Sequence, residues 1–427
     1  MAADTYLAQG SQYVREVYAP RVVRIYPEAN FLTKNIVFNQ ATRVGKQYVV
    51  PIELAPEQGV TYAGPSAGAF ALVGAQALST QDAIISPSQI VVQRALDYES
   101  IQRTVGSKAA FVSMIDATLR SVVALATKRL EVSMLWGQYP NGIAVVNTST
   151  AGSGGTGAGG TRVLNIVPAE WSGGLWGGLE NALVDVWSAG FAAQRNVALN
   201  LKVQSVNLTT QTVTVQNIAS DAGLANIAAT DIIVFGGTIG AGPTYNEMAG
   251  LAQIASNTGT LFNISAATYG LWNGNTITAW GAPSLGKILD GVSKLIERGL
   301  DEDVVFLCSP KHFSRLNSDQ TALRLYDSSY KQEAQTGFQQ LRFASENGAI
   351  IVRSHRFMKD GYALAFPVSK CMRIGSTELT FTNMGVDGDI FIQTPGVASV
   401  ELRGYLGQAL LCVAPARTFL ATGITYP

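Results

Sequence analysis

Gly64–Gly68 matches the Gly-x-Ser-x-Gly pattern of a hydrolase nucleophile elbow, with Ser66 at its centre. That elbow is a strained turn between a strand and a helix, and acid and histidine partners follow it along the chain. Ser66 instead lies in a tract of Gly, Ala and Pro with no helical pattern behind it. The chain has only two histidines, His312 in the first turn of an expected helix and His355 in an expected strand. Since nothing places either near Ser66, we expect no hydrolase site.

A second glycine pattern, Gly152-x-Gly154-x-x-Gly157, matches a dinucleotide-binding fingerprint. Such a site needs a helix N-terminus directly after the glycines to hold the pyrophosphate. Residues 161–167 follow here and read as a strand, and no Lys-Ser/Thr pair makes the pattern a P-loop. The pattern therefore predicts a flexible loop or linker over Gly152–Gly160. We expect this segment to act as a hinge within the subunit.

Metal ligands are also sparse. The two histidines and three cysteines have no zinc spacing, and Cys308, Cys371 and Cys412 lie in apolar surroundings that predict buried free thiols. The acidic clusters Asp301–Asp303 and Asp387-x-Asp389 are more typical of solvated turns than of a calcium loop.

Three tryptophans, Trp171, Trp176 and Trp187, have no neighbouring cationic cluster for stacking on nucleic-acid bases, so we expect them to pack internally. No catalytic, cofactor-binding or metal-binding residue remains. We therefore predict a protein that is not an enzyme and needs no cofactor.

The composition points to an assembly. The chain has 427 residues, of which 47% are hydrophobic and only 14% charged. A soluble chain with so few charges usually hides surface against other copies. Lys plus Arg equals Asp plus Glu at 30 each, without the basic excess typical of a nucleic-acid binder. Ala55–Gln93 carries only Glu57 and Asp82, and Val203–Gly286 has no Lys or Arg.

No signal peptide is visible after Met1, and no apolar run approaches the ~20 residues needed to span a bilayer. We therefore expect a protein made in the cytoplasm that has no membrane partner.

The first half of the chain alternates strand and helix signals. Residues 46–53 and 89–97 read as two strands that pair, and the segment between them, 56–88, reads as a projecting two-stranded loop. Apolar residues at helical spacing predict a long helix over 107–136.

Further along, Ser284 and Gly299 bound a second amphipathic helix. Residues 303–308 read as a buried strand, and Ser309–Pro310 begins a third helix. Strand patterns at 197–206, 212–216 and 231–235 predict an inserted β module near 195–240. Strands expected at 349–352, 362–366, 390–393 and 397–413 would form an antiparallel sheet. This order predicts an α+β fold.

The order of these elements resembles the major capsid proteins of tailed double-stranded DNA bacteriophages, which have the Hong Kong 97-type fold. The stretches that carry the resemblance are Phe31–Val37, the helix running into Leu135–Gly137, Val304–Pro310 and Glu401–Pro415. Together they span nearly the whole chain.

The resemblance implies a division of the chain and a set of partners. Residues 1–40 would be an N-terminal arm, 41–105 an extended E-loop lying over a neighbouring subunit, and 106–140 the spine helix of a peripheral domain. Residues 141–340 would form the axial domain with its inserted module, and 341–427 the return strands of both domains. The protein would form hexamers and pentamers of an icosahedral virion shell enclosing double-stranded DNA, assembled in the bacterial cytoplasm. Portal and scaffolding proteins would be partners, and contact with DNA would be non-specific.

Some relatives join subunits through a Lys–Asn isopeptide bond that uses a lysine of the E-loop. Ala55–Gln93 contains no Lys, so a shell held by non-covalent contacts is expected. The alternatives are an encapsulin-like nanocompartment shell, which shares the fold, and a β-rich surface or decoration adhesin. A hydrolase or nucleotide-binding enzyme ranks after these.

Overall fold

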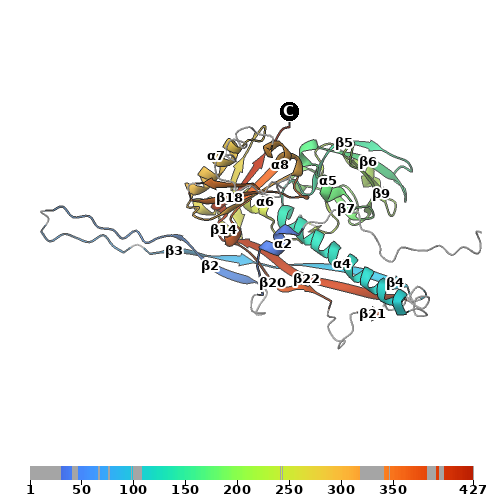
Figure 1. The fold of residues 1–427 in the computed structure, drawn as a ribbon, viewed down its shortest axis with the longest axis horizontal. Helices are drawn as coiled ribbons and strands as arrows, with labels where there is room; N and C mark the ends of the chain where they lie inside the picture. Colours follow the sequence, from blue (N-terminus) through green and yellow to red (C-terminus); the bar gives the residue numbers. More distant parts are fainter. Residues whose placement is uncertain are drawn as a thin grey trace, which may run out of the picture.

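The computed structural model describes residues 30–40, 47–65, 68–75, 77–97, 99, 108–240, 242, 244–317, 341–345, 347–381, 391–393 and 399–426. Most of the expected arm, the expected cap Ser107, and Ser66 lie outside these residues. Figure 1 shows three folded parts: an elongated sheet with a long helix along it, a mixed sheet flanked by helices, and a barrel. A thin two-stranded hairpin projects from them (Figure 1).

The elongated sheet is built around one long strand, β22. Its strands are β1 (Phe38–Gln40), β20 (Cys371–Thr380), β22 (Ser399–Cys412), β21 (Phe391–Gln393) and β4 (Ser88–Asp97). β4 runs antiparallel along one side of β22, and β20 and β21 pair with its other side.

The helix α4 (Lys108–Trp136) packs on β4 and β22, which confirms the predicted long helix from residue 108 onward. Its 29 residues make a rod of roughly 44 Å at 1.5 Å rise per residue. Val122, Ala126 and Leu130 form the buried stripe expected from the sequence. Residues 130–137 are buried on all sides, because the other two folded parts enclose the end of the helix.

The mixed sheet has six strands, in the order β15 (Asn275–Ile277), β23 (Phe419–Thr422), β19 (Tyr362–Phe366), β16 (Val304–Cys308), β18 (Gly348–Ser354) and β17 (Leu341–Ser345). Its helices are α6 (Leu251–Ala255), α7 (Leu285–Ile296) and α8 (Pro310–Asn317). Both helix starts predicted here are confirmed, since Ser284 accepts from the Lys287 N–H and Ser309 from the His312 N–H. Gly299, at φ +87°, follows α7 as expected.

The third part is a closed barrel in the order β10–β5–β6–β9–β8–β7. Its strands are β5 (Ala144–Ala151), β6 (Thr161–Ile166), β7 (Leu183–Trp187), β8 (Leu201–Asn207), β9 (Thr212–Asn217) and β10 (Ile232–Phe235). The predicted β module near 195–240 was therefore too small. The closed barrel also includes β5, β6 and β7, which precede residue 195 in the sequence.

Two local predictions concern the barrel. Gly152–Gly160 is the hairpin loop between the neighbouring strands β5 and β6, which confirms the predicted loop and excludes a linker between two domains. Its backbone is fixed by hydrogen bonds such as Gly152 N–H to Thr161 O (3.0 Å). The strand expected from residue 197 begins only at Leu201, because the Asp221 carboxylate accepts from the Val197 N–H at 2.7 Å and holds a turn there.

The projecting hairpin is made of β2 (Tyr48–Ala55) and β3 (Ser79–Ile85), which pair antiparallel. The predicted pairing of residues 46–53 with 89–97 is wrong. β4, which contains the second of these segments, pairs instead with β22, more than 300 residues away along the chain. Local strand propensity carries no information about so distant a partner.

The final strands do not form one antiparallel sheet, which corrects a second prediction. β18 and β19 belong to the mixed sheet, where β18 runs parallel to β16, whereas β21 and β22 belong to the elongated sheet.

Shorter elements complete the described fold: α2 (Phe31–Asn35), α5 (Gly173–Trp176), β11 (Ile239–Gly240), β12 (Thr244–Tyr245), β13 (Thr260–Leu261), β14 (Ile264–Ser265), and the 3₁₀ turns Pro168–Glu170, Ala189–Phe191, Ala222–Asn226, Gly270–Trp272, Val368–Lys370 and Pro415–Arg417.

A buried carboxylate joins α2 to α4. Glu131, fully buried in α4, accepts hydrogen bonds from the backbone N–H groups of Leu32 (2.7 Å) and Thr33 (3.0 Å). Its Oε1 also lies 3.1 Å from His355 Nε2. One side chain therefore connects the first described helix, the long helix and the loop after β18.

We predict that Glu131→Gln lowers the free energy of unfolding by about 2–4 kcal/mol, because the amide cannot accept from all three donors and leaves buried groups unpaired. Chemical denaturation measures the change. Glu297→Gln, an exposed position next to α7, is the matched control and should stay within about 0.5 kcal/mol of the parent protein. Equal stability of the two variants would contradict this role for Glu131.

Candidate assembly interface

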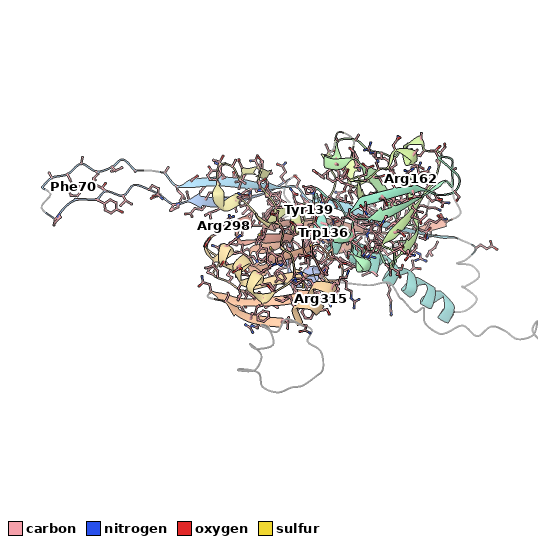
Figure 2. All side chains as sticks on the ribbon, turned by 90° about the horizontal axis from the view of Figure 1, so that it is seen from above. Phe70, Trp136, Tyr139, Arg162, Arg298 and Arg315 are labelled. Atoms are coloured by element: carbon pink, nitrogen blue, oxygen red, sulfur yellow. The ribbon has the colours of Figure 1, made fainter. Side chains whose placement is uncertain are left out.

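The hairpin extends well beyond its two strands. After β2 and before β3, the described residues of 56–78 run out as two arms without regular secondary structure (Figure 1). Figure 2 shows Phe70 near the far end, away from the body of the molecule. Two arms of about 11 residues at roughly 3.3 Å per residue reach about 35 Å past the strands.

The exposed side chains of this extension are largely apolar. Tyr62 is 92% exposed and Leu72 78%, and others of the same kind are Val60, Phe70, Val73 and Leu78. Ala55–Gln93 offers only Glu57 and Asp82 as charges. Several large apolar side chains exposed along one extension are typical of an interaction site.

The root of the hairpin is fixed to the body. Ala83 and Ile85 of β3 are buried, and the Ile84 N–H donates to the Phe262 carbonyl at 2.9 Å. The Ser79 hydroxyl lies 3.3 Å from the Tyr269 hydroxyl. The direction of the hairpin is therefore set by the folded body.

A groove of about 640 Å³ lies between β4, the middle of α4 and the barrel. Ile90, Val91, Leu125, Leu179 and Phe235 supply its apolar lining. Among the described residues, β4 has a ladder partner only on its β22 side, and residues 89–93 of this strand line the groove. A free strand edge beside apolar side chains is suited to receive an extended segment.

Charged forms are disfavoured along the floor of this groove. Burial raises the pKa of Glu247 to about 7 and lowers the pKa of Arg129 to about 10. The Arg129 guanidinium lies 3.4 Å from the centre of the Phe235 ring, and Glu247 accepts from the Gln138 N–H at 3.2 Å. Lys128, on the same helix, has its pKa lowered to about 8, first by burial and then by Arg129.

Glu247 predicts a pH dependence of stability. Its pKa is raised from 4.5 to about 7, so the folded state binds this proton more tightly than the unfolded chain does. The resulting stabilisation is complete below pH 4.5 and is lost as the pH rises through 7. Glu247→Gln should therefore match the parent at pH 4 and exceed its free energy of unfolding at pH 8 by about 1–3 kcal/mol. Denaturation at both pH values, with the exposed Glu57→Gln as control, tests this; a variant less stable at pH 8 would refute it.

The nucleophile-elbow residues do not gather into a site among the described residues. Gly64 and Gly68 lie in the projecting extension, where a Cβ on either would meet no other atom within 4 Å, and the described residues 68–97 after them contain no helix. His312 is buried in α8, where desolvation lowers its pKa to about 4. His355 lies just after β18, not within a strand as expected, and contacts Glu131.

The second glycine pattern is followed by β6, as the sequence analysis predicted, so no helix N-terminus faces Gly152–Gly157. Residues of the first acidic cluster form ion pairs and a hydrogen bond to the backbone. Asp301 lies 3.0 Å from Arg417, and Glu302 pairs with Lys370. Asp387 and Asp389 lie outside the described residues, within which no group of three or more His, Cys, Asp or Glu side chains is placed to hold a metal.

The tryptophans pack internally, as predicted. Trp171 and Trp176 stack with their ring centres 6.2 Å apart, and Trp187 meets Phe191 edge to face.

The three cysteines are buried and free, also as predicted. The sequence did not show that Cys371 and Cys412 face each other across β20 and β22. Among all the residues that the structure describes, no helix is both long enough and apolar enough to cross a membrane.

Sequence reasoning missed the buried ionic groups. Glu131, Glu170 and Lys359 each have an apolar neighbour in the sequence. A charged residue directly beside apolar ones was the available signal. It identifies a buried charge but not its partner, which comes here from more than 180 residues away.

The overall fold is shared with solved capsid structures. A subunit of the cyanophage A-1(L) capsid asymmetric unit superposes with a TM-score of 0.55 at 10% identity, covering 98% of this chain and 99% of that one. The capsid of a native GTA particle, solved with C5 symmetry, gives 0.50 at 7% identity over the full length of both chains. No protein-family model and no curated protein sequence matches the chain. At this level of identity the likeness concerns the fold, and the chain has the α+β fold of these capsid proteins.

Proposed function

We propose that this protein is the major capsid protein of a tailed bacteriophage, a subunit that assembles into the hexamers and pentamers of an icosahedral head. The observation that carries the proposal is the projecting apolar hairpin on a capsid fold. Its strand β3 is packed against the body, and the apolar side chains of its extension are exposed to solvent. Such a surface gains its stability by burial against another molecule. In a closed shell, that molecule is a second copy of the chain.

In this proposal the parts of the chain take the roles that the resemblance implies. Residues 1–40 are the N-terminal arm, 41–105 the E-loop that contains the hairpin, and 106–140 the spine helix. Residues 141–340 form the axial domain, into which the barrel is inserted, and 341–427 return to the peripheral and axial domains. The hairpin then lies across a neighbouring subunit, and the groove beside β4 is a suitable apolar receiving surface.

The shell encloses double-stranded DNA without reading its sequence, in keeping with a zero net charge. Portal and scaffolding proteins are the expected partners. An encapsulin-like shell would enclose protein cargo instead. Nuclease-protected DNA in particles purified from lysed host cells supports the phage head, and protein cargo without DNA supports the nanocompartment.

The assembly test uses one exposed hairpin residue. Leu72→Asp places a charge where we expect an apolar contact, so the variant should keep the thermal transition of the parent subunit but form no rings or closed particles. Negative-stain microscopy and sedimentation velocity measure the difference. Leu289→Asp, on the exposed side of α7, is the matched control and should still assemble. A parent protein that stays monomeric at high concentration, or a Leu72→Asp variant that assembles normally, would contradict the proposal.

The shell is expected to be held by non-covalent contacts, because Ala55–Gln93 offers no lysine for a crosslink between subunits. Mature particles boiled in denaturant should therefore run as a single subunit band. A ladder of covalent multimers in the same gel would refute this expectation.

A further inference from the structure

A lysine is fully buried where the three folded parts meet. Lys359 lies in the turn between β18 and β19, and its side chain has no exposed surface. Trp136, Tyr139 and Tyr362 surround its ammonium group, with the Trp136 ring centre 4.5 Å away. Figure 2 shows Trp136 and Tyr139 between the barrel and the mixed sheet.

One carboxylate connects this lysine to a side-chain amide. Glu170, itself buried at the end of the turn after β6, has its Oε2 2.7 Å from Lys359 Nζ. Its Oε1 accepts from Asn141 Nδ2 at 2.6 Å and from the Tyr362 hydroxyl. Asn141 lies in the turn between α4 and β5. The amine and the primary amide therefore bind the two oxygens of the same carboxyl group. Lys359 Nζ also donates to the carbonyl of Gly142, the residue after Asn141, at 2.8 Å.

The surroundings favour the uncharged form of the lysine. Burial lowers the pKa of Lys359, although Glu170 opposes that shift. In an apolar site, moving a proton from the ammonium to the carboxylate removes two buried charges. The product is a nucleophilic amine beside a carboxylic acid, held by the fold at high effective concentration against the amide.

We propose that Lys359 and Asn141 become joined by an intramolecular isopeptide bond, with Glu170 moving the protons. Lys359 Nζ attacks Asn141 Cγ, a new C–N bond forms, and the bond from Cγ to Nδ2 breaks. Glu170 gives its proton to the leaving nitrogen and regains one from Nζ, so the net products are one amide crosslink and one ammonia. The step needs no oxidant or cofactor, and each chain performs it once.

This bond would tie the end of α4 and the start of the barrel to the mixed sheet. It closes a loop of more than 200 residues within one subunit, which restricts the unfolded chain. It links no two subunits, so it is independent of the proposed assembly and of the single band expected in denaturing gels.

Intact-mass spectrometry of the purified full-length protein, fresh and after prolonged incubation, tests the proposal. The parent is expected to be lighter than its sequence by one ammonia, whereas Lys359→Arg, Asn141→Ala and Glu170→Gln keep their full sequence masses. Lys128→Arg is the matched control, because Lys128 is a buried lysine bonded to the backbone carbonyl of Gly177. This control should lose ammonia as the parent does.

A peptide map completes the test, because Asn141 precedes Gly142 and a succinimide at that bond would lose the same mass. The crosslink predicts one branched peptide that contains both Asn141 and Lys359. A parent protein that keeps its full mass, or an ammonia loss that maps to the Asn141–Gly142 bond alone, would overturn the proposal. Both measurements on the parent hold even if a variant fails to fold.

Discussion

The apolar hairpin is the constraint on which this account depends. Its extension exposes Tyr62, Phe70 and Leu72 to water with almost no charge nearby, a state whose free energy falls only when another surface covers it. The body of the same chain does not cover it, because the Ile84–Phe262 hydrogen bond and buried Ala83 and Ile85 direct the hairpin outward. In the proposed shell, the apolar side chains of the hairpin are therefore covered by another copy of the chain.

The body supplies the rigidity that such a projection needs. β22 holds β4 over ten residue pairs, and β4 begins three residues after β3 ends, so the hairpin is continuous with the elongated sheet. The long helix lies on that sheet, and its buried end enters the junction of barrel and mixed sheet. Glu131 and the Glu170–Lys359 pair place buried hydrogen-bonded groups at these contacts, where losing one partner is costly and the relative position of the parts is well specified.

The sequence predicted the locally encoded elements well. Ser284, the apolar stripe of 285–296 and Gly299 define α7 within a short stretch, and a continuous apolar run identified β16. The projecting two-stranded loop over 56–88 was also inferred, from the length of the segment between two strand patterns. These features depend on neighbours along the chain.

Features that depend on distant residues were missed or misassigned. The partner of β4 lies in β22, the barrel closes through strands that precede the predicted module, and the Lys359 partner comes from the turn after β6. Periodicity within one segment does not identify such partners. The solved capsid structures share the fold at about 10% identity or less, so the arrangement is preserved while most side chains differ.

Amide hydrogen exchange of residues 56–78, compared between free subunits and assembled particles, tests the central claim most directly. The account predicts fast exchange in the free subunit and strong protection in the particle, because the hairpin becomes covered only by a neighbouring copy. Equal, fast exchange in both states would show that the hairpin stays uncovered and would contradict the account.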